Sequence, residues 1–294
     1  MKFLQPEFSS MHTHTIFCDG IDDVETMCRA AYEKNLFAIG FSAHSPVEKQ
    51  LGIKSDWNLK AEKVNEYISE VLAAKERWQK KLKVFLGLEA DYIKGIRSPL
   101  DSDIKAMNLD YIIGSVHYLA PRGASPFTVD GPKEEFEKGL KEGYGNDAQK
   151  LMNAYYDAVL EMILSGGFDI LGHADIIKKN TYNKNLWPLE NEVRRQREIA
   201  RAASDTGIAI EVNTGGINRK KTHDVYPSLS FLKIFNEFNV PFIITSDAHC
   251  ADDITGNYDI AAQTLISADI KTHVFFNKRK NCNAVWQKEI IQQK

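Results

Sequence analysis

The sequence lacks both a long hydrophobic run and an excess of positive charge. No segment reaches the roughly 18 consecutive apolar residues that a membrane-spanning helix requires, and residues 1–10 lack the apolar run of a secretory signal peptide. The formal net charge of −3 gives no electrostatic reason to expect nucleic acid or an anionic membrane as a partner. We therefore expect a cytoplasmic protein with neither kind of partner.

Cysteine is also scarce, and the chain has no linker rich in proline, glycine and serine. The four cysteines, Cys18, Cys28, Cys250 and Cys282, form no CxxC pair and no regular spacing. This pattern excludes a disulfide framework and favours reduced thiols. Without a linker or an internal repeat to divide the chain, we expect residues 1–294 to form one domain. Nothing in the sequence specifies an oligomeric state.

What the sequence does have is seven pairs of polar residues, and the two members of each pair are two positions apart. The pairs are His12 and His14, Ser42 and His44, Glu89 and Asp91, Ser115 and His117, His173 and Asp175, Glu211 and Asn213, and Asp247 and His249. Each pair closes a short apolar run typical of a buried β-strand. Because strand side chains alternate between two faces, each pair directs both of its polar groups the same way.

The expected strands alternate with helical patterns along almost the whole chain. We expect strands at residues 10–14, 36–42, 83–89, 110–117, 168–173, 208–213 and 241–247. Helical spacing of apolar residues predicts helices over 64–78 and 151–163, the second ending at Gly166-Gly167, and a third that begins at Pro188. This order predicts an α/β fold, a seven-stranded TIM-like (βα) barrel with its polar site at the C-terminal ends of the strands.

Two further segments lie outside this pattern. Residues 119–145 contain several prolines and glycines, so we expect an irregular loop that passes over the mouth of the barrel. The C-terminal tail has a short apolar run at 273–276, and we expect a helix around 284–291 that packs on the outside of the barrel.

The polar pairs have the composition of a metal site. Six of the eight histidines lie on them, together with several carboxylates, and His, Asp and Glu are ligands of divalent metals. The pairs of the first and last strands are neighbours only if the sheet closes. Glu89 ends a buried strand, where an ionised carboxylate is costly unless a cation compensates it.

Seven segments resemble the successive motifs of the polymerase and histidinol phosphatase (PHP) superfamily. They are MHTHTIFCDG, FSAHSP, GLEADY, GSVHYL, LGHADIIKK, EVNTGG and ITSDAH. Within that superfamily, SVHY, EADY and EVNTGG resemble the histidinol-phosphate phosphatases. The resemblance covers roughly residues 9 to 255. It implies a distorted seven-stranded (βα) barrel that holds up to three metal ions, in agreement with the strand count.

The resemblance also implies three ligand sets. His12, His14, Glu89 and Asp247 would hold one metal, and His44, His117 and a bridging Glu89 a second. The third set would be Asp19, His173 and His249. Glu89, Asp247 and His249 are the residues that we expect at the catalytic centre.

Asp19 departs from the pattern of some superfamily members, which have a histidine near this position. Asp19 is therefore either a metal ligand or only a residue of the turn that Asp19-Gly20 forms. We expect Asp175 to orient His173, because a ligating imidazole usually donates its other N–H to a carboxylate or carbonyl.

Charged residues near the pairs are candidates for binding the substrate. Arg219, Lys178 and Lys179 follow the EVNTGG and LGHAD motifs, and they either clamp a phosphate, as basic residues in similar positions do in the family, or lie on the solvated surface. Asp91, on the same strand face as Glu89, is a candidate partner for a cationic amine or imidazole. Basic residues near the rim favour a small phosphate ester as substrate.

The resemblance implies a metal-dependent phosphatase that hydrolyses L-histidinol phosphate in histidine biosynthesis. It implies two to three divalent metal ions per chain, which would be zinc, iron or manganese. One alternative is a PHP-type phosphoesterase that acts on a nucleotide or on phosphotyrosine. A second alternative is a metal-binding barrel without catalytic activity.

Overall fold

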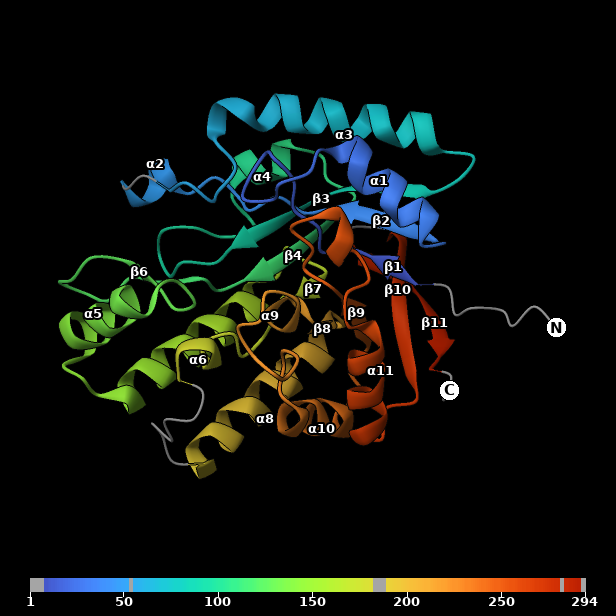
Figure 1. Ribbon diagram of the computed structural model, residues 1–294. Helices are drawn as coiled ribbons and strands as arrows, with labels where there is room; N and C mark the ends of the chain where they lie inside the picture. The colour runs from blue at the N-terminus through green and yellow to red at the C-terminus, as the bar shows by residue number, and fades with distance from the viewer. Residues whose placement is uncertain (1–7, 53–54, 182–188, 281–282, 292–294) are drawn as a thin grey trace.

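Seven parallel strands form a sheet that nearly closes into a barrel (Figure 1). The computed structural model describes residues 8–52, 55–181, 189–280 and 283–291. In sheet order the strands are β1 (Ser9–Ser10), β2 (Ala38–Phe41), β3 (Lys83–Asp91), β4 (Tyr111–Ser115), β7 (Ile170–Leu171), β8 (Ala209–Asn213) and β9 (Phe242–Thr245). A parallel bridge between Thr13 and Ala248 brings the segment after β1 against the segment after β9. The predicted seven-stranded barrel is confirmed.

Helices cover the outside of the strands. The longer ones are α1 (Val24–Glu33), α3 (Val64–Trp78), α6 (Ala148–Ser165), α8 (Leu189–Thr206), α10 (Leu229–Glu237) and α11 (Tyr258–Ser267). Shorter turns of helix lie in the connections: α2 (Glu48–Leu51), η1 (Ala61–Lys63), α4 (Ser102–Ala106), α7 (Lys178–Thr181), α9 (Gly215–Asn218) and η2 (Ala251–Asp253). Figure 1 shows α1 and α3 on one side of the strands and α6, α8 and α10 on the other. None of the described helices is long and apolar enough to cross a membrane.

Helices α1 and α6 begin at sequence signals, and α6 also ends at one. The Asp23 side chain accepts a hydrogen bond from Thr26 N at 2.7 Å at the start of α1, and the Asp147 side chain accepts one from Lys150 N at 3.1 Å at the start of α6. Helix α6 ends at Gly166, which has φ of 74°, as the Gly-Gly pair predicts. The predicted start at Pro188 lies outside the described residues, and α8 is described from Leu189 onward.

The barrel interior has an apolar layer beneath a polar one, and the two-residue period of the strands explains both. Phe85 and Glu89 lie on the same face of β3, because they are an even number of residues apart. Phe85 packs with Tyr111 and Ile243 in a buried apolar cluster. Glu89 lies further along the same face and is fully buried. The polar layer therefore sits at the C-terminal ends of the strands, on a solid apolar floor.

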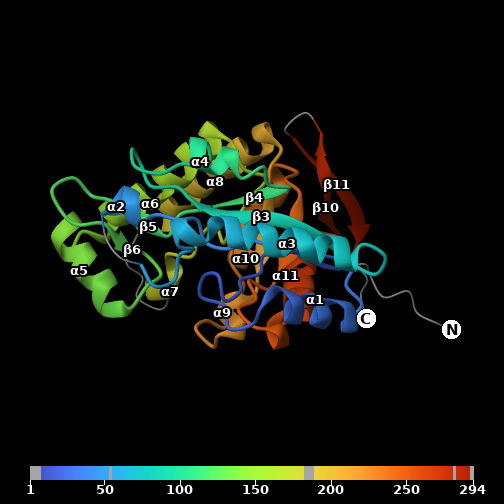
Figure 2. The ribbon, with the colours of Figure 1, turned by 90° about the horizontal axis from the view of Figure 1, so that it is seen from above.

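The C-terminal tail forms a hairpin, and the prediction of a helix over 284–291 is wrong. Strand β10 (Thr272–Lys280) pairs antiparallel with β11 (Asn283–Ile290). In β11 the alternating residues Ala284 and Trp286 pack against the apolar cluster of the barrel floor, which also contains Phe276 of β10. Pairing with β10 and this alternating burial override the helical tendency of the segment. Figures 1 and 2 show the hairpin at the opposite end of the molecule from α5 (Lys133–Tyr144).

The segment 119–145 lies at the mouth, as expected, but it is more regular than predicted. It contains part of a small hairpin, β5 (Tyr118–Leu119) and β6 (Phe127–Thr128), followed by α5. Two of the glycines that suggested a loop, Gly139 and Gly143, are packing positions of α5. A Cβ on Gly139 would lie 2.3 Å from the ring of Phe127, and one on Gly143 would lie 2.5 Å from Pro121.

Candidate active site

Glu89 is the centre of the polar layer. Its Oε1 atom lies 2.9 Å from His173 Nε2 and 3.4 Å from His117 Nε2. Its Oε2 atom lies 3.1 Å from His12 Nε2 and 2.8 Å from His44 Nδ1. The two carboxylate oxygens therefore face two different groups of imidazoles, which is the geometry that a bridging ligand needs.

Asp247 lies on the Oε2 side of Glu89, where it forms a first group of metal-ligand candidates with His12 and His14. Its Oδ1 atom lies 3.2 Å from His14 Nε2 and 3.6 Å from His12 Nε2. Together with Glu89 Oε2, these atoms place two imidazole nitrogens and two carboxylate oxygens around one point. Nitrogen and oxygen donors in such a number suit a divalent cation.

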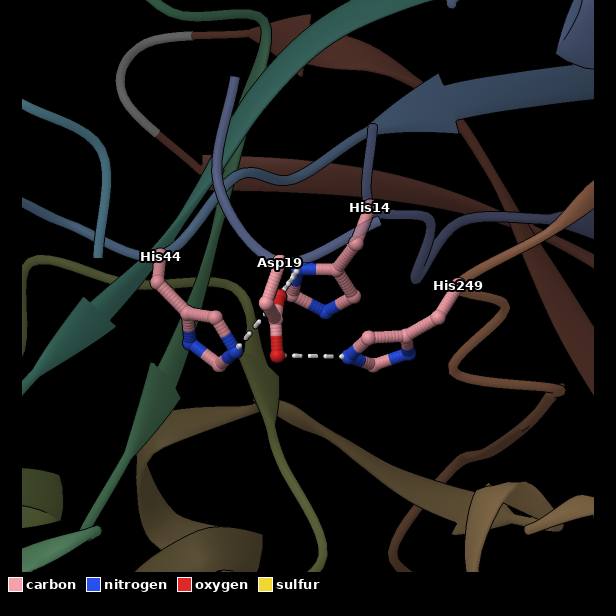
Figure 3. A group of neighbouring side chains, drawn as sticks. All are labelled: His14, Asp19, His44 and His249. Carbon is pink, nitrogen blue, oxygen red and sulfur yellow. Dashed lines mark hydrogen bonds and ion pairs between the residues drawn. The ribbon is translucent and has the colours of Figure 1, made fainter. Parts of the chain in front are cut away.

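A second group of donors, drawn in Figure 3, consists of Asp19, His14, His44 and His249, and two of its members, Asp19 and His249, are partly exposed. Asp19 lies between two histidines, with Oδ2 at 3.1 Å from His249 Nε2 and Oδ1 at 3.7 Å from His44 Nε2. Gly20 allows the chain to turn tightly here, since a Cβ at this position would lie 2.5 Å from Thr15 N. Asp19 is thus a residue of a turn, and that turn directs its carboxylate toward the imidazoles.

The structure brings together the first predicted set, His12, His14, Glu89 and Asp247, and the second, His44, His117 and Glu89. It does not bring together the third, Asp19, His173 and His249. His173 groups with Glu89 and lies beside His117, whereas Asp19 and His249 group with His14 and His44. The sheet order explains the difference. His173 follows β7, which pairs with β4, while Asp19 and His249 follow β1 and β9 on the other side of the mouth. Because the strands keep their chain order in the sheet, the predicted barrel already implied this separation of His173 from Asp19 and His249.

Several donors at the site are buried without a hydrogen-bond partner. They are His12 Nε2, His14 Nε2, Asp19 Oδ1, His44 Nδ1 and Glu89 Oε2. Buried polar atoms are nearly always hydrogen-bonded, and these converge on one another at short range without hydrogen-bond geometry. Cations held between them would satisfy these atoms, so the residues present fit divalent metals.

Protonation states at the site also suit metal binding. Burial, with the nearby imidazoles of His249 and His44, lowers the pKa of His14 to about 3, so this imidazole is neutral at pH 7. Burial opposes ionisation of Glu89, but His12 and the other imidazoles outweigh it and hold the pKa of this carboxyl well below its ordinary value. Burial likewise disfavours the imidazolium of His117, but Glu89 and Asp91 raise its pKa to about 10. Metal binding would therefore displace a proton from His117.

A cavity of about 510 Å³ opens over these groups. Four of the histidines, His44, His117, His173 and His249, line its inner end. The rest of its lining includes three cations, three carboxylates and two aromatic residues: Lys179, Arg219, Lys221, Asp56, Asp130, Glu135, Trp57 and Tyr118. Arg219 Nη2 donates to Asp247 Oδ2 at 3.0 Å, so this guanidinium links the metal-ligand candidates to the cavity wall.

Comparison with known proteins agrees with this geometry. The model of the PHP domain matches residues 10–215, which is more than half of the chain. The chain belongs to the PHP family. A "Probable histidinol-phosphatase" of Deinococcus radiodurans is 29% identical, and the match covers 92% of this chain and 96% of that protein. The predicted resemblance to histidinol phosphatases is thus confirmed.

Solved structures confirm the PHP barrel. The hisK protein of Listeria monocytogenes has a TM-score of 0.75 at 22% identity, covering 85% of this chain and 98% of its own. A histidinol phosphate phosphatase of Lactococcus lactis, crystallised with zinc, L-histidinol and phosphate, has a TM-score of 0.65 at 21% identity. The likeness covers 95% of this chain and 99% of that one.

Around the PHP site, Glu211 is a residue that the sequence prediction missed. It is fully buried, and Oε1 accepts hydrogen bonds from His12 Nδ1 at 2.5 Å and from the Thr245 hydroxyl at 2.6 Å. Oε2 accepts from His173 N at 2.7 Å. Glu211 therefore holds the tautomer of His12 that leaves Nε2 free for a metal. Its place in one of the seven polar pairs was the signal.

Asp91 was predicted to contact the cationic end of the substrate. The structure instead places it behind His117. It is fully buried and does not line the cavity. Its Oδ1 atom accepts a hydrogen bond from His117 Nδ1 at 2.8 Å. Although Asp91 and Glu89 share a strand face, the strand carries Asp91 past the centre of the cluster to the outer side of the His117 ring.

Asp91→Asn should weaken the affinity for a divalent metal by about 10- to 100-fold, the usual effect of losing a carboxylate that orients a ligating histidine. A competition titration with a chelator measures the change. Asp56→Asn, which alters an exposed carboxylate in the same cavity, is the control. An unchanged affinity in Asp91→Asn would show that His117 needs no such partner.

Asp175 and Lys178 also differ from prediction. Asp175 makes no hydrogen bond to the His173 ring. It accepts one from Ser228 N at 3.0 Å, and Lys178 Nζ lies 3.2 Å from it. Lys178 also pairs with Glu192 at 2.8 Å and does not line the cavity. Adjacent residues of a helix point in different directions, so Lys179 faces the cavity whereas Lys178 faces away.

Proposed function

We propose that the protein is a metal-dependent phosphomonoesterase that hydrolyses L-histidinol phosphate to L-histidinol and phosphate, a step of histidine biosynthesis. The observation that carries this proposal is the convergence of buried, partnerless nitrogen and oxygen donors on the inner end of a cavity whose wall includes Lys179, Arg219 and Lys221. The relative crystallised with zinc, L-histidinol and phosphate supports the choice of substrate.

The geometry suggests which residues would hold the metals. His12, His14, Glu89 and Asp247 form one set, and Glu89 with His117 and His173 forms another. The third set would contain Asp19, His44 and His249. We propose two to three divalent ions per chain, either zinc, iron or manganese, because such nitrogen and oxygen sites accept all three.

Phosphate monoesters are among the slowest biological substrates to hydrolyse without a catalyst. Bound divalent ions would supply a water of lowered pKa as nucleophile and would neutralise charge on the phosphoryl oxygens. Glu89, Asp247 and His249 would surround the reacting phosphate as ligands, so no side-chain nucleophile is required. Glu211 and Asp91 keep the rings of His12 and His117 oriented.

Arg219 and Lys179 are the cations that we propose for the phosphate. Both line the cavity, and Arg219 lies beside Asp247 and His249, with Nη1 at 2.8 Å from His249 Nδ1. A guanidinium can bind two oxygens of a phosphate at once. The proposal places the phosphate between this arginine and the ligand cluster.

Arg219→Met should lower kcat/KM by about 10- to 150-fold, because one charge-assisted hydrogen bond contributes roughly 1.5 to 3 kcal/mol. Inhibition by inorganic phosphate should weaken in parallel, while bound metal is retained. Lys220→Met is the matched control, since Lys220 is exposed and does not line the cavity. A loss confined to metal content, with unchanged phosphate inhibition, would contradict the phosphate role.

A substrate panel tests the proposed function. We expect kcat/KM for L-histidinol phosphate to exceed the values for nucleoside monophosphates, phosphotyrosine and p-nitrophenyl phosphate. A preference for a nucleotide or phosphotyrosine would favour a PHP phosphoesterase with a different role. No turnover of any ester by metal-loaded protein would favour a binding protein.

We further propose that the chain is a single cytoplasmic domain with a small molecule as its partner.

A further inference from the structure

One ion pair in the cavity belongs to neither the ligand cluster nor the fold's supporting contacts. Asp130 follows β6, and Lys179 lies on α7, and both line the cavity. Lys179 Nζ lies 3.5 Å from Asp130 Oδ2, the upper limit of a hydrogen bond. The Lys179 side chain is 25% exposed and that of Asp130 is 22% exposed, so solvent and a ligand reach both.

The other carboxylates of the cavity have different surroundings. Asp19 and Asp247 belong to the ligand cluster. Glu135 holds the adjacent hairpin, because its Oε1 atom accepts hydrogen bonds from Thr128 N at 2.9 Å and the Thr128 hydroxyl at 3.0 Å. Asp56 is exposed at the rim. Asp130 is thus a half-buried carboxylate whose partner in the cavity is Lys179. A bound ligand could take the place of that lysine.

Asp130 also lies close to the reacting end of the cavity. Burial opposes its ionisation, but Lys179, His117, His173 and Arg219 together lower the pKa of its carboxyl. Two of these residues are candidate metal ligands, and Arg219 is the proposed phosphate partner. A negative charge at Asp130 therefore lies within electrostatic range of the place where the phosphate would bind.

We propose that Asp130 and Lys179 form an exchangeable ion pair that selects phosphate esters carrying a nearby ammonium group. Lys179 turns to the phosphate, and Asp130 receives the ammonium. This inference rests on the proposed function, which it extends to the amine of L-histidinol phosphate. Two carbons separate that amine from the ester oxygen. The ammonium and the phosphate of the substrate are therefore close together, as the charges of Asp130 and Lys179 are.

Exchange of partners explains the selectivity. A substrate that carries both a phosphate and an ammonium breaks the ion pair between Asp130 and Lys179. It forms two new pairs, phosphate with Lys179 and ammonium with Asp130, so no charge is left without a partner. An ester without the ammonium takes Lys179 away from Asp130 and leaves a half-buried carboxylate uncompensated, which is unfavourable. The pair therefore discriminates against simple phosphate esters as well as favouring aminated ones.

The test compares Asp130→Asn with the wild-type enzyme on L-histidinol phosphate and on its deamino analogue, 3-(imidazol-4-yl)propyl phosphate. We expect kcat/KM for L-histidinol phosphate to fall by roughly 10- to 100-fold, the effect of one charge-assisted hydrogen bond. The value for the analogue should stay unchanged or rise, and inorganic phosphate should inhibit more strongly because Lys179 is released. Asp130→Glu, which keeps the charge, should keep the preference.

Asp56→Asn is the matched control, and it should leave both rates unchanged. Equal losses on the two substrates, or no loss on either, would overturn the inference. O-phosphoethanolamine and ethyl phosphate separate this result from failure of the proposed function. If the wild type hydrolyses neither histidinol compound, but Asp130→Asn still selectively impairs O-phosphoethanolamine, the substrate proposal fails and the role of Asp130 stands.

Discussion

Glu89→Gln should lower kcat by several orders of magnitude and reduce the bound metal. The carboxylate directs Oε1 toward His117 and His173 and Oε2 toward His12 and His44. An amide offers one oxygen of weaker donor strength and no negative charge, so it cannot serve both groups. Steady-state kinetics and metal analysis on the same preparation measure the effect.

The matched control is Glu135→Gln, because Glu135 lines the same cavity but holds Thr128 rather than the cluster. We expect this control to keep its full complement of metal and nearly all of its activity. If Glu89→Gln kept most of its turnover, a bridging role for this carboxylate would be wrong.

Removal of the metals should abolish activity and lower the thermal stability of the protein. The cluster packs His14 against His44 and against His249 with ring centroids 4.3 Å apart in both cases, and it leaves buried donors without partners. A metal present at about 1,000 times its Kd stabilises the native state by roughly 4 kcal/mol. For a chain of this size that corresponds to a shift of roughly 5 to 10 °C in Tm.

Thermal unfolding of chelator-treated protein, before and after adding back zinc or manganese, measures this shift. Glu89→Gln should show a much smaller shift on addition of metal, and Asp56→Asn should behave like the wild type. Equal Tm values with and without metal would mean that the donors need no cation in the folded state.

The strand pattern and most of the candidate site could be predicted from the sequence, because both depend on local periodicity. Continuous apolar runs give the seven buried strands. The two-residue spacing of pairs such as Glu211 and Asn213 places polar groups beyond the apolar floor of the barrel. The same periodicity was ambiguous in the tail, where β11 (Asn283–Ile290) forms through pairing with β10.

The grouping of His173 follows from the pairing of β4 with β7, consecutive strands of the predicted barrel, and could have been inferred from the sequence. Features that depend on the direction of a ring could not be predicted. The role of Asp91 depends on which side of the His117 ring it reaches. Trp57 comes from an irregular segment, and only the fold shows that its ring lies against His44, at 4.6 Å between centroids, and stacks on Tyr118.

Metal content and phosphate release from L-histidinol phosphate, measured on one sample of purified, metal-loaded protein, test the proposed enzyme most directly. We expect two to three divalent ions per chain and release of phosphate that disappears on chelation and returns with added metal. Fully loaded protein that released no phosphate from L-histidinol phosphate would contradict the proposed reaction. Full activity with one ion or none per chain would contradict the proposed metal cluster.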